Sequence, residues 1–346
     1  MKLPRSGVEF RTRSGRAASA FVASLVSLLA LTGSVLCRRP TAPHGRIVLT
    51  YMDARLSKPA ALVLPRYRFS VGQRLSYHTD CWFPWKSGTE EQTRIRTAWV
   101  TDSNPDGSWR VVLLARSAST FLDSAGRELR RETGVRLVYF DMFRDGQHKM
   151  NPTVFGADPA LFFLQMPADS TEAAKGWQYG MGTERDTVYC TFGGLVASQP
   201  RLAAIRVTQA AGLRAAASDH AIELVLFDTD RGLLWRREGK YYSPGEWKGE
   251  GHAVGELDTV VVLSSEELAR FKHDADVYFK AWLDSRGLMG LMHERPAKVD
   301  SLSAAVESVF ARTRSQVTDT LILAALNDDV IALHKHVRDI GEREDH

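Results

Sequence analysis

The chain has 346 residues, of which 44% are hydrophobic and 25% are charged, with 26 Gly and 13 Pro. These proportions exclude collagen-like, low-complexity and wholly disordered chains, and the length is sufficient for a sizeable core. The formal net charge of +4 is unevenly distributed, because residues 1–46 contain eight basic residues and a single acidic one. The rest of the chain is therefore slightly acidic, which argues against a nucleic-acid-binding protein that relies on phosphate contacts.

Residues 17–37 (AASAFVASLVSLLALTGSVLC) carry no charge and follow five basic residues. A helix of this length spans the hydrocarbon core of a bilayer. Two interpretations fit: a cleaved signal peptide with a small residue at Ser34, and an uncleaved anchor with a cytoplasmic N-terminus. Lipidation of Cys37 is disfavoured, because Leu36 stands where a small residue is required. We therefore predict that residues 1–37 are a signal peptide or membrane anchor that contacts the membrane through residues 17–37. The rest of the chain is predicted to lie extracytoplasmically in the cell envelope, either membrane-anchored or secreted.

The cysteines agree with export to an oxidising compartment. Besides Cys37, the chain has Cys81 and Cys190, each in strand-like surroundings. A disulfide between these two would close a loop of about 110 residues and stabilise the fold by ~4–5 kcal/mol in the chain-entropy model. Two buried free thiols are the alternative, since the sequence does not show whether the two Cβ atoms meet.

Composition and hydrophobic period divide the rest of the chain into three parts. Residues 38–63 mix Pro, Arg and short apolar pieces, and we predict that they tether the apolar segment to a folded domain. Residues 64–263 contain one strand-like run after another, separated by turn sequences such as Asn104-Pro-Asp-Gly107. The prediction for this part is a mainly β, extracytoplasmic domain with an antiparallel sheet, either a curved sheet or a sandwich.

A short motif recurs within this β-rich part. Val138-Tyr-Phe-Asp141 and Val225-Leu-Phe-Asp228 each place a hydrophobic strand before a charged turn that contains Gly. One interpretation is a pair of related lobes, 64–167 and 168–263. The other is coincidence, because Phe-Asp before a Gly turn is common in hairpins and a short match is little support for a repeat.

Residues 264–346 show a helical period, so the predicted fold is mainly β with an α-helical C-terminus. Ser264-Ser-Glu-Glu267 has the spacing of a capping box. We expect the following helix to end at Gly287 and a second helical region to begin near Asp300, with a break near Thr318. The first helix carries an apolar stripe that we expect to pack on the β-domain. The stripe consists of Leu268, Phe271, Ala275, Tyr278 and Trp282.

The stretch Phe69-Ser-Val-Gly-Gln-Arg-Leu-Ser-Tyr77 resembles the first hairpin of a group of exported bacterial β-rich proteins of unknown function. Met166-Pro167, Gly176-Trp177 and Gly232-Leu233 follow in a similar order. That group resembles the LolA-type lipoprotein carriers, in which a curved antiparallel sheet cups an apolar ligand. The resemblance covers residues 64–263 and implies a carrier-like architecture, but it supplies no catalytic residue.

Catalytic motifs are absent from the sequence, which contains no GxSxG, HExxH, P-loop or GxGxxG. His334-Lys-His336 would place its two rings on nearly opposite sides of a helix, so it does not predict a metal site. His78 and Asp80 can share one face of a strand and are the first residues to inspect for catalysis. A satisfied polar strand face explains the same pattern. We predict no cofactor and no metal, and favour a protein that is not an enzyme.

Aromatic residues beside cations mark two candidate ligand-binding surfaces. The candidates are Trp82 and Trp85 in one segment and Trp235, Tyr241 and Trp247 in another. Such stacking residues suit sugars or single-stranded nucleic acid. The predicted export and the slightly acidic domain argue against nucleic acid. Strands that pack aromatic residues inward and Arg outward are the alternative explanation.

These patterns favour a non-enzymatic cell-envelope protein whose β-rich domain binds an apolar ligand or a partner protein. Two alternatives remain open: an envelope hydrolase whose site assembles from distant residues, and a structural or assembly protein that uses its C-terminal helices. A cavity with apolar walls would favour the first hypothesis, and converging carboxylates or His would favour the hydrolase. A solid β core with an exposed apolar helix stripe would favour the structural protein.

Overall fold

The computed structural model describes residues 47–344, apart from 48, 53, 59–62, 86, 151–161, 182–185, 211–219, 244–248 and 295–297. The predicted signal peptide or anchor at 17–37 lies outside the described residues. Within them, no helix has both the length and the apolar character needed to span a membrane.

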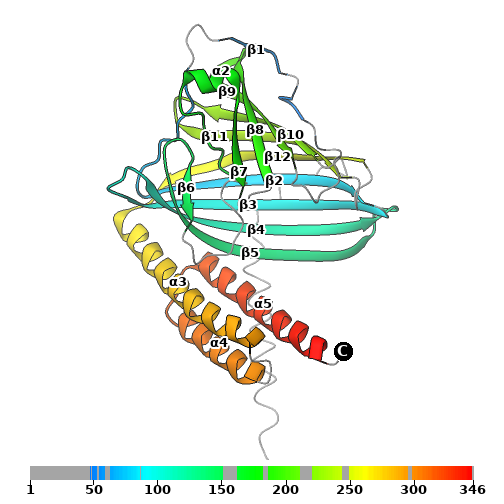
Figure 1. Cartoon of the computed structure of the whole chain (residues 1–346), viewed down its shortest axis with the longest axis vertical. Helices are drawn as coiled ribbons and strands as arrows, with labels where there is room; N and C mark the ends of the chain where they lie inside the picture. Colours follow the sequence, from blue (N-terminus) through cyan, green and yellow to red (C-terminus); the bar gives the residue numbers. More distant parts are fainter. Residues whose placement is uncertain are drawn as a thin grey trace, which may run out of the picture. The chain divides into compact units, whose positions relative to one another are not determined.

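A single 12-stranded antiparallel sheet forms the centre of the structure (Figure 1). Its order is β1-β8-β9-β10-β11-β12-β2-β3-β4-β5-β6, and β7 pairs with β8 outside this path. The strands are β1 Leu56–Ser57, β2 Gln73–Trp85, β3 Gly88–Ser103, β4 Trp109–Asp123, β5 Glu128–Met142, β6 His148–Met150, β7 Trp177–Met181, β8 Asp186–Val196, β9 Gln199–Ala210, β10 His220–Asp228, β11 Leu233–Ser243 and β12 Gly249–Val262. The predicted antiparallel β-rich domain is thus confirmed.

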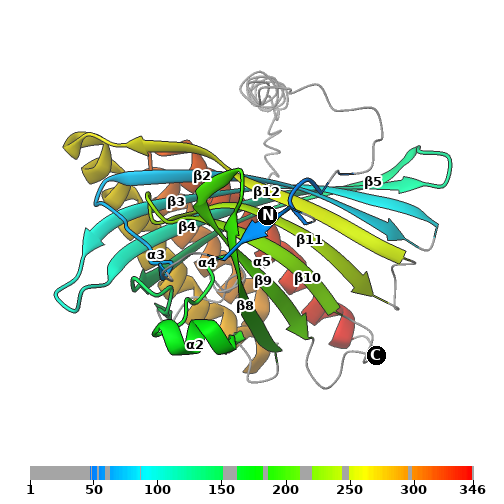
Figure 2. The ribbon, with the colours of Figure 1, turned by 90° about the horizontal axis from the view of Figure 1, so that it is seen from above.

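Strands from both candidate lobes, 64–167 and 168–263, belong to this one sheet. The two halves join where β12 pairs with β2, for example Ala253 opposite Cys81. The sheet is curved, as the two views show (Figure 1 and Figure 2). Of the two architectures expected from the sequence, the described strands therefore form a curved sheet and not a sandwich of two separate sheets.

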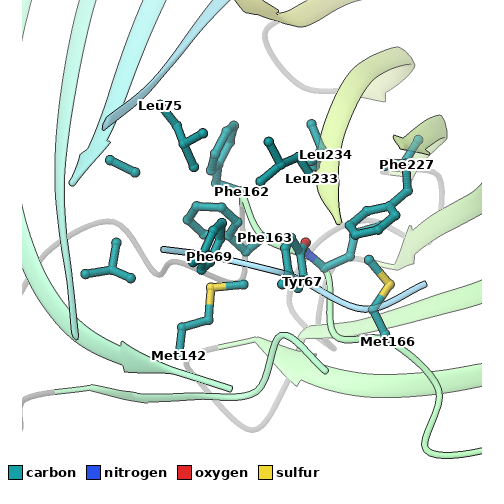
Figure 3. Packing of buried hydrophobic residues seen from close by; sticks show 14 of the residues in the cluster. Tyr67, Phe69, Leu75, Met142, Phe162, Phe163, Met166, Phe227, Leu233 and Leu234 are labelled. Carbon is teal, nitrogen blue, oxygen red and sulfur yellow. The ribbon is translucent and has the colours of Figure 1, made fainter. Parts of the chain in front are cut away.

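The inner face of the curved sheet, which carries Leu75 and Tyr77, holds the largest hydrophobic cluster. Alternate residues of β2 point to this face, which is the period-two pattern of a strand with one covered side. The segment 162–166 runs across the inner face, and Phe162 and Phe163 lie between Leu75 and Met142 on one side and Phe227 on the other (Figure 3).

The helices are α2 Ser170–Lys175, α3 Ser265–Glu294, α4 Val299–Arg314 and α5 Thr320–Glu344. The last three pack together against the outer face of β3–β5, which carries Trp99 and Leu114 (Figure 1). The capping box is confirmed, because Ser264 Oγ accepts from Glu267 N at 3.3 Å and Glu267 Oε2 accepts from Ser264 N at 2.8 Å. The expected end at Gly287 is wrong, since α3 continues to Glu294 and buries Met292.

The helical stripe divides between two partners. Phe271 stacks on Trp99 of the sheet, with ring centroids 4.4 Å apart, as expected. Tyr278 instead donates to Asp329 of α5 at 2.7 Å, so this part of the stripe faces the helical bundle. The predicted break near Thr318 separates α4 from α5, and the buried Asp274 of α3 accepts from Thr318 N at 2.8 Å there.

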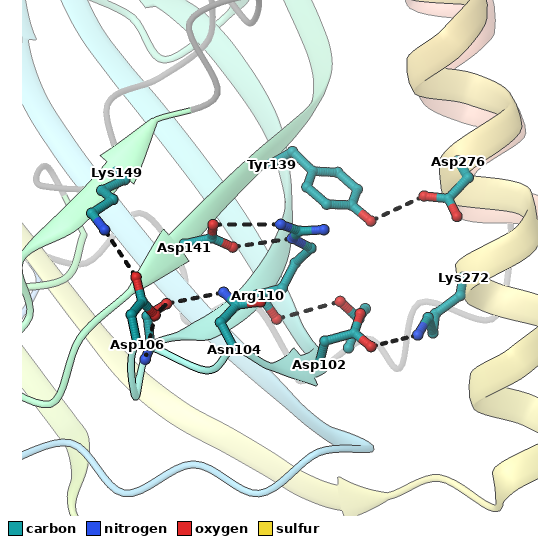
Figure 4. A network of polar contacts seen from close by, with 11 residues as sticks. Asp102, Asn104, Asp106, Arg110, Tyr139, Asp141, Lys149, Lys272 and Asp276 are labelled. Carbon is teal, nitrogen blue, oxygen red and sulfur yellow. Dashed lines mark hydrogen bonds and ion pairs between the residues drawn. The ribbon is translucent and has the colours of Figure 1, made fainter.

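Polar contacts also attach α3 to the sheet (Figure 4). Lys272 donates to Asp102 at 2.6 Å, and Tyr139 donates to Asp276 at 3.1 Å. Burial and the adjacent carboxylate of Asp276 both raise the pKa of Tyr139, so its hydroxyl remains a proton donor. The bundle is therefore held to the sheet by directional bonds as well as by apolar packing.

Part of the predicted tether 38–63 lies on the outer face of β9–β11. The carboxylate of Glu238, which is buried, accepts from the backbone N–H groups of Thr50, Tyr51 and Met52 at 2.7–3.1 Å. The ring of Tyr51 meets Trp235 edge-on, with centroids 5.6 Å apart. The described part of this segment is thus packed on the domain.

Candidate functional site

A cavity of about 250 Å³ lies on the inner face of the sheet, beside Phe162 and Leu164. Most of its walls are aromatic or aliphatic. The lining residues are Tyr77, Thr79, Cys81, Phe83, Arg94, Arg96, Phe162, Leu164, Tyr179, Val188, Val207, Glu223, Leu234, Arg237, Gly239, Tyr241, Ala253, Gly255 and Glu256. They come from β2, β3, β7–β12 and segment 162–166, so the cavity exists only once the two halves of the sheet have joined.

Strand register brings these side chains to one face. Arg96 lies opposite Tyr77 across the β2–β3 pair, and Arg94 lies opposite Thr79. On the other side of β2, Thr79 faces Gly255 of β12. Because side chains in an antiparallel pair share a face with their direct partner, these residues form neighbouring rows.

Small residues on β11 and β12 create the space. A Cβ atom on Gly255 would stand 2.6 Å from Thr79 Oγ1, and one on Gly239 would stand 2.8 Å from the hydroxyl of Tyr241. Larger residues at these two positions would displace the side chains that form the wall. Gly239 therefore lets the ring of Tyr241 lie against the sheet, and Gly255 makes room for the side chain of Thr79.

One end of the cavity holds a buried ion pair. Arg237 pairs with Glu223, and Tyr241 donates to the same carboxylate at 2.8 Å. Arg237 also donates to the carbonyl of Phe162 at 3.0 Å, which fixes segment 162–164 over the sheet. Burial opposes the charge of Arg237, but the nearby carboxylate of Glu223 outweighs this effect. The pKa of Arg237 is therefore raised. Burial, together with Glu223, raises the pKa of Tyr241, so that its hydroxyl keeps its proton.

Arg96 occupies a different environment in the same cavity. Its guanidinium carbon lies 5.1 Å from the centroid of the Phe162 ring, and within the described chain it makes no hydrogen bond or ion pair. Burial lowers the pKa of Arg96 to about 10, and the neighbouring charges of Arg94 and Arg237 contribute. Arg94 donates its Nε–H to the side chain of Gln92. The cavity thus carries more positive charge than its own acids neutralise.

The pair His78 and Asp80 lies on the opposite face of β2 from the cavity. His78 Nε2 and Asp80 Oδ1 are 2.9 Å apart, and Thr93 donates to Asp80 at 3.2 Å. The two residues do share a strand face, as the sequence suggests. Their neighbours Tyr77 and Thr79 point to the cavity, so this pair is separated from it by the sheet.

The five aromatic candidates are not brought together. Among them, Tyr241 lines the cavity, whereas Trp235 packs on Tyr51 of the outer face. Trp82 lies beside His252, with centroids 6.3 Å apart, and Trp85 packs edge-on against Phe121 at 5.5 Å. Trp247 lies outside the described residues.

Cys81 and Cys190 are both buried free thiols, so the disulfide considered from the sequence is not formed in this structure. Burial raises the pKa of Cys190 to about 12, and burial likewise raises that of Cys81, which lines the cavity. A thiol in such surroundings is a poor nucleophile. No His lines the cavity in the described part of the chain, and no group of three or more potential metal ligands occurs there.

The sequence analysis missed the five charged residues that line the cavity, which are Arg94, Arg96, Glu223, Arg237 and Glu256. Arg94 and Arg96 alternate with Thr93 and Ile95, which predicts a half-buried strand without showing which face is covered. Glu223 is the one acid inside the otherwise apolar run Ala221–Phe227. An isolated acid in a strand of that kind is a usable signal, because burying a carboxylate requires a partner.

These features define a class of protein: a β-rich domain with one curved antiparallel sheet, a cavity on its inner face and a C-terminal helical bundle. No protein-family profile and no curated protein matches the sequence. Among solved structures, a domain assigned to outer membrane lipoprotein sorting in Vibrio parahaemolyticus aligns with 57% of this chain and 89% of its own, at 6% identity and a TM-score of 0.17. Its description is in line with the LolA-type resemblance of residues 64–263, but at this TM-score the match supports no conclusion about fold or function.

Proposed function

We propose that the β-rich domain is a non-enzymatic, extracytoplasmic module of the cell envelope that binds an apolar or amphipathic ligand in the inner-face cavity. The observation that carries this proposal is the cavity itself, whose walls are mostly aromatic and aliphatic. Binding pockets for small molecules combine such walls with a few convergent polar groups. The cell-envelope location rests on the apolar segment 17–37 and its basic flank.

The size of the cavity limits how much of a ligand it can enclose. An apolar cavity of about 150 Å³ is large enough to bind benzene. A cavity of about 250 Å³ therefore encloses a larger apolar group, such as part of an acyl chain. The absence of a His beside the buried thiol, among the lining residues described, favours binding over hydrolysis.

The test is a fluorescence titration with the neutral probe N-phenyl-1-naphthylamine, using the full chain as the cell processes it. Val207→Phe places extra volume in the cavity, and we expect it to weaken probe binding about tenfold or more. The matched control is Ile222→Phe on the other face of the neighbouring strand, where the side chain is exposed. Thermal unfolding of both variants verifies that each is folded. Probe binding that is absent in the parent chain, or equal in all three proteins, would refute the proposal.

A further inference from the structure

Arg96 is a cation that lacks a counterion within the described chain, and it faces a mostly apolar cavity. Among the acids of the lining, Glu223 is already engaged by Arg237 and Tyr241. The carboxylate of Glu256, at the cavity edge, pairs with Arg236 at 2.8 Å. Arg96 is half-buried, and partial burial of a charge without a partner costs free energy, so an anion bound beside it would be stabilised.

Two phenol hydroxyl groups point to the same conclusion independently. The side chains of Tyr77 and Tyr179 are 1% and 8% exposed, and both line the cavity. Neither hydroxyl has a hydrogen-bond partner among the described residues. Buried polar atoms in native proteins are nearly always satisfied, so an unpaired hydroxyl at a cavity wall indicates a missing partner. Burial raises the pKa of both groups, so that each hydroxyl is available as a donor.

Phe162 connects these groups. Its ring meets Tyr77 edge-on, with centroids 4.6 Å apart, and lies beneath the guanidinium of Arg96. Tyr77 and Arg96 are also direct cross-strand partners. One cation and one unpaired donor thus converge on the same side of the cavity, while Leu164, Val188 and Leu234 supply apolar surface.

We propose that the ligand is an amphiphile with an oxyanion headgroup, a carboxylate or a phosphate, which pairs with Arg96 and accepts hydrogen bonds from the hydroxyls of Tyr77 and Tyr179. The inference rests on the proposed function, since it specifies the ligand class of the same cavity. Guanidinium groups bind carboxylates and phosphates through paired hydrogen bonds that are stronger than neutral ones. The apolar chain of the amphiphile would occupy the aromatic and aliphatic part of the cavity.

The experiment displaces bound N-phenyl-1-naphthylamine from the full chain with decanoate, decyl phosphate or decanol. These competitors share one chain length and differ in headgroup. We expect one or both anions to bind about tenfold to a hundredfold more tightly than the alcohol, because a hydrogen bond to a charged group contributes more than a neutral one. The ranking of decanoate against decyl phosphate identifies which oxyanion the site accepts.

Arg96→Gln should abolish this preference and leave decanol binding within about twofold of the parent chain. The matched control is Arg116→Gln, which removes a half-buried arginine from the opposite face of the same sheet. This variant should keep the preference. Tyr77→Phe and Tyr179→Phe should each weaken anion binding several-fold without lowering the unfolding midpoint, because each change removes a buried hydroxyl that has no described partner.

Two failures are distinguishable. If the neutral probe and decanol do not bind, the proposed function is wrong, and so is the inference that the ligand carries an oxyanion headgroup. If the probe and decanol bind but neither anion binds more tightly than decanol, only the inference about the headgroup is wrong. The same holds if Arg96→Gln retains the preference for anions. A folded Arg96→Gln variant, verified by its unfolding midpoint and by probe binding, is required for the second result.

Discussion

Truncating Phe271 tests whether the C-terminal bundle belongs to the fold of a single chain. Phe271 is 4% exposed, and its ring stacks on Trp99 with an interplanar angle of 19°. Replacing a buried Phe with Ala typically lowers the free energy of unfolding by about 3–5 kcal/mol. This loss is the sum of the lost transfer free energy and the cost of the cavity that remains. We expect Phe271→Ala to cost about 4 kcal/mol, because the sheet beneath Trp99 cannot collapse into the space.

The assay is denaturant unfolding of a monomeric sample, followed by tryptophan fluorescence. The matched control is Leu283→Ala on the same helix, where the side chain is 41% exposed and truncation should cost less than about 1 kcal/mol. Equal stability of Phe271→Ala and the parent chain, together with loss of an oligomer, would contradict the argument. The helical stripe would then be a surface for a partner chain, and the structural-protein hypothesis would gain support.

Three further predictions concern the framework around the site. Burial raises the pKa of Asp329 from 3.8 to about 6, so the folded state holds a proton that the unfolded state has lost between these pH values. The free energy of unfolding should therefore fall by up to about 3 kcal/mol as pH rises through this window, and Asp329→Asn should abolish the fall in urea titrations. Glu238→Gln should lower the free energy of unfolding by about 3 kcal/mol and speed hydrogen exchange of the amides at 50–52. The reason is that the buried carboxylate of Glu238 accepts hydrogen bonds from three backbone N–H groups. Gly146→Ala should lower the free energy of unfolding by more than about 3 kcal/mol, measured by thermal unfolding, because the new Cβ would lie 2.0 Å from the carbonyl oxygen of Leu164. The control is Gly107→Ala, which has the same φ of 81° but open space around it and should lower the free energy of unfolding by about 1 kcal/mol.

Features of the fold that depend on neighbouring residues were predictable from the sequence. The capping box at Ser264–Glu267 is complete within a few residues, and it is confirmed. The end of α3 was not predictable in this way. Gly287 costs about 1 kcal/mol inside a helix, but burial of Met292 one turn further on contributes more. Tertiary packing therefore decides where this helix ends.

The cavity depends on strand order, which local patterns do not encode. Tyr77 and Ala253 lie on strands that pair across most of the domain, because β12 returns to β2. The contact between His78 and Asp80 was predictable, since both belong to one strand. Which face of that strand would meet the cavity was not, because a strand with alternating side chains does not show which of its faces is covered.

The inner face of the sheet is packed at one end and hollow at the other, and the sequence explains both. At the packed end, Tyr67 meets Phe227 edge-on at 5.2 Å, and its hydroxyl accepts from Leu164 N (Figure 3). At the hollow end, glycines occupy positions 239 and 255, and charged side chains lie among the aromatic residues that line the cavity. Filling the hollow end with apolar residues would add stability at no cost in topology. At the hollow end, a half-buried arginine without a described counterion and two buried, unpaired hydroxyls reduce stability in the empty state. This is the expected signature of a surface maintained for a ligand.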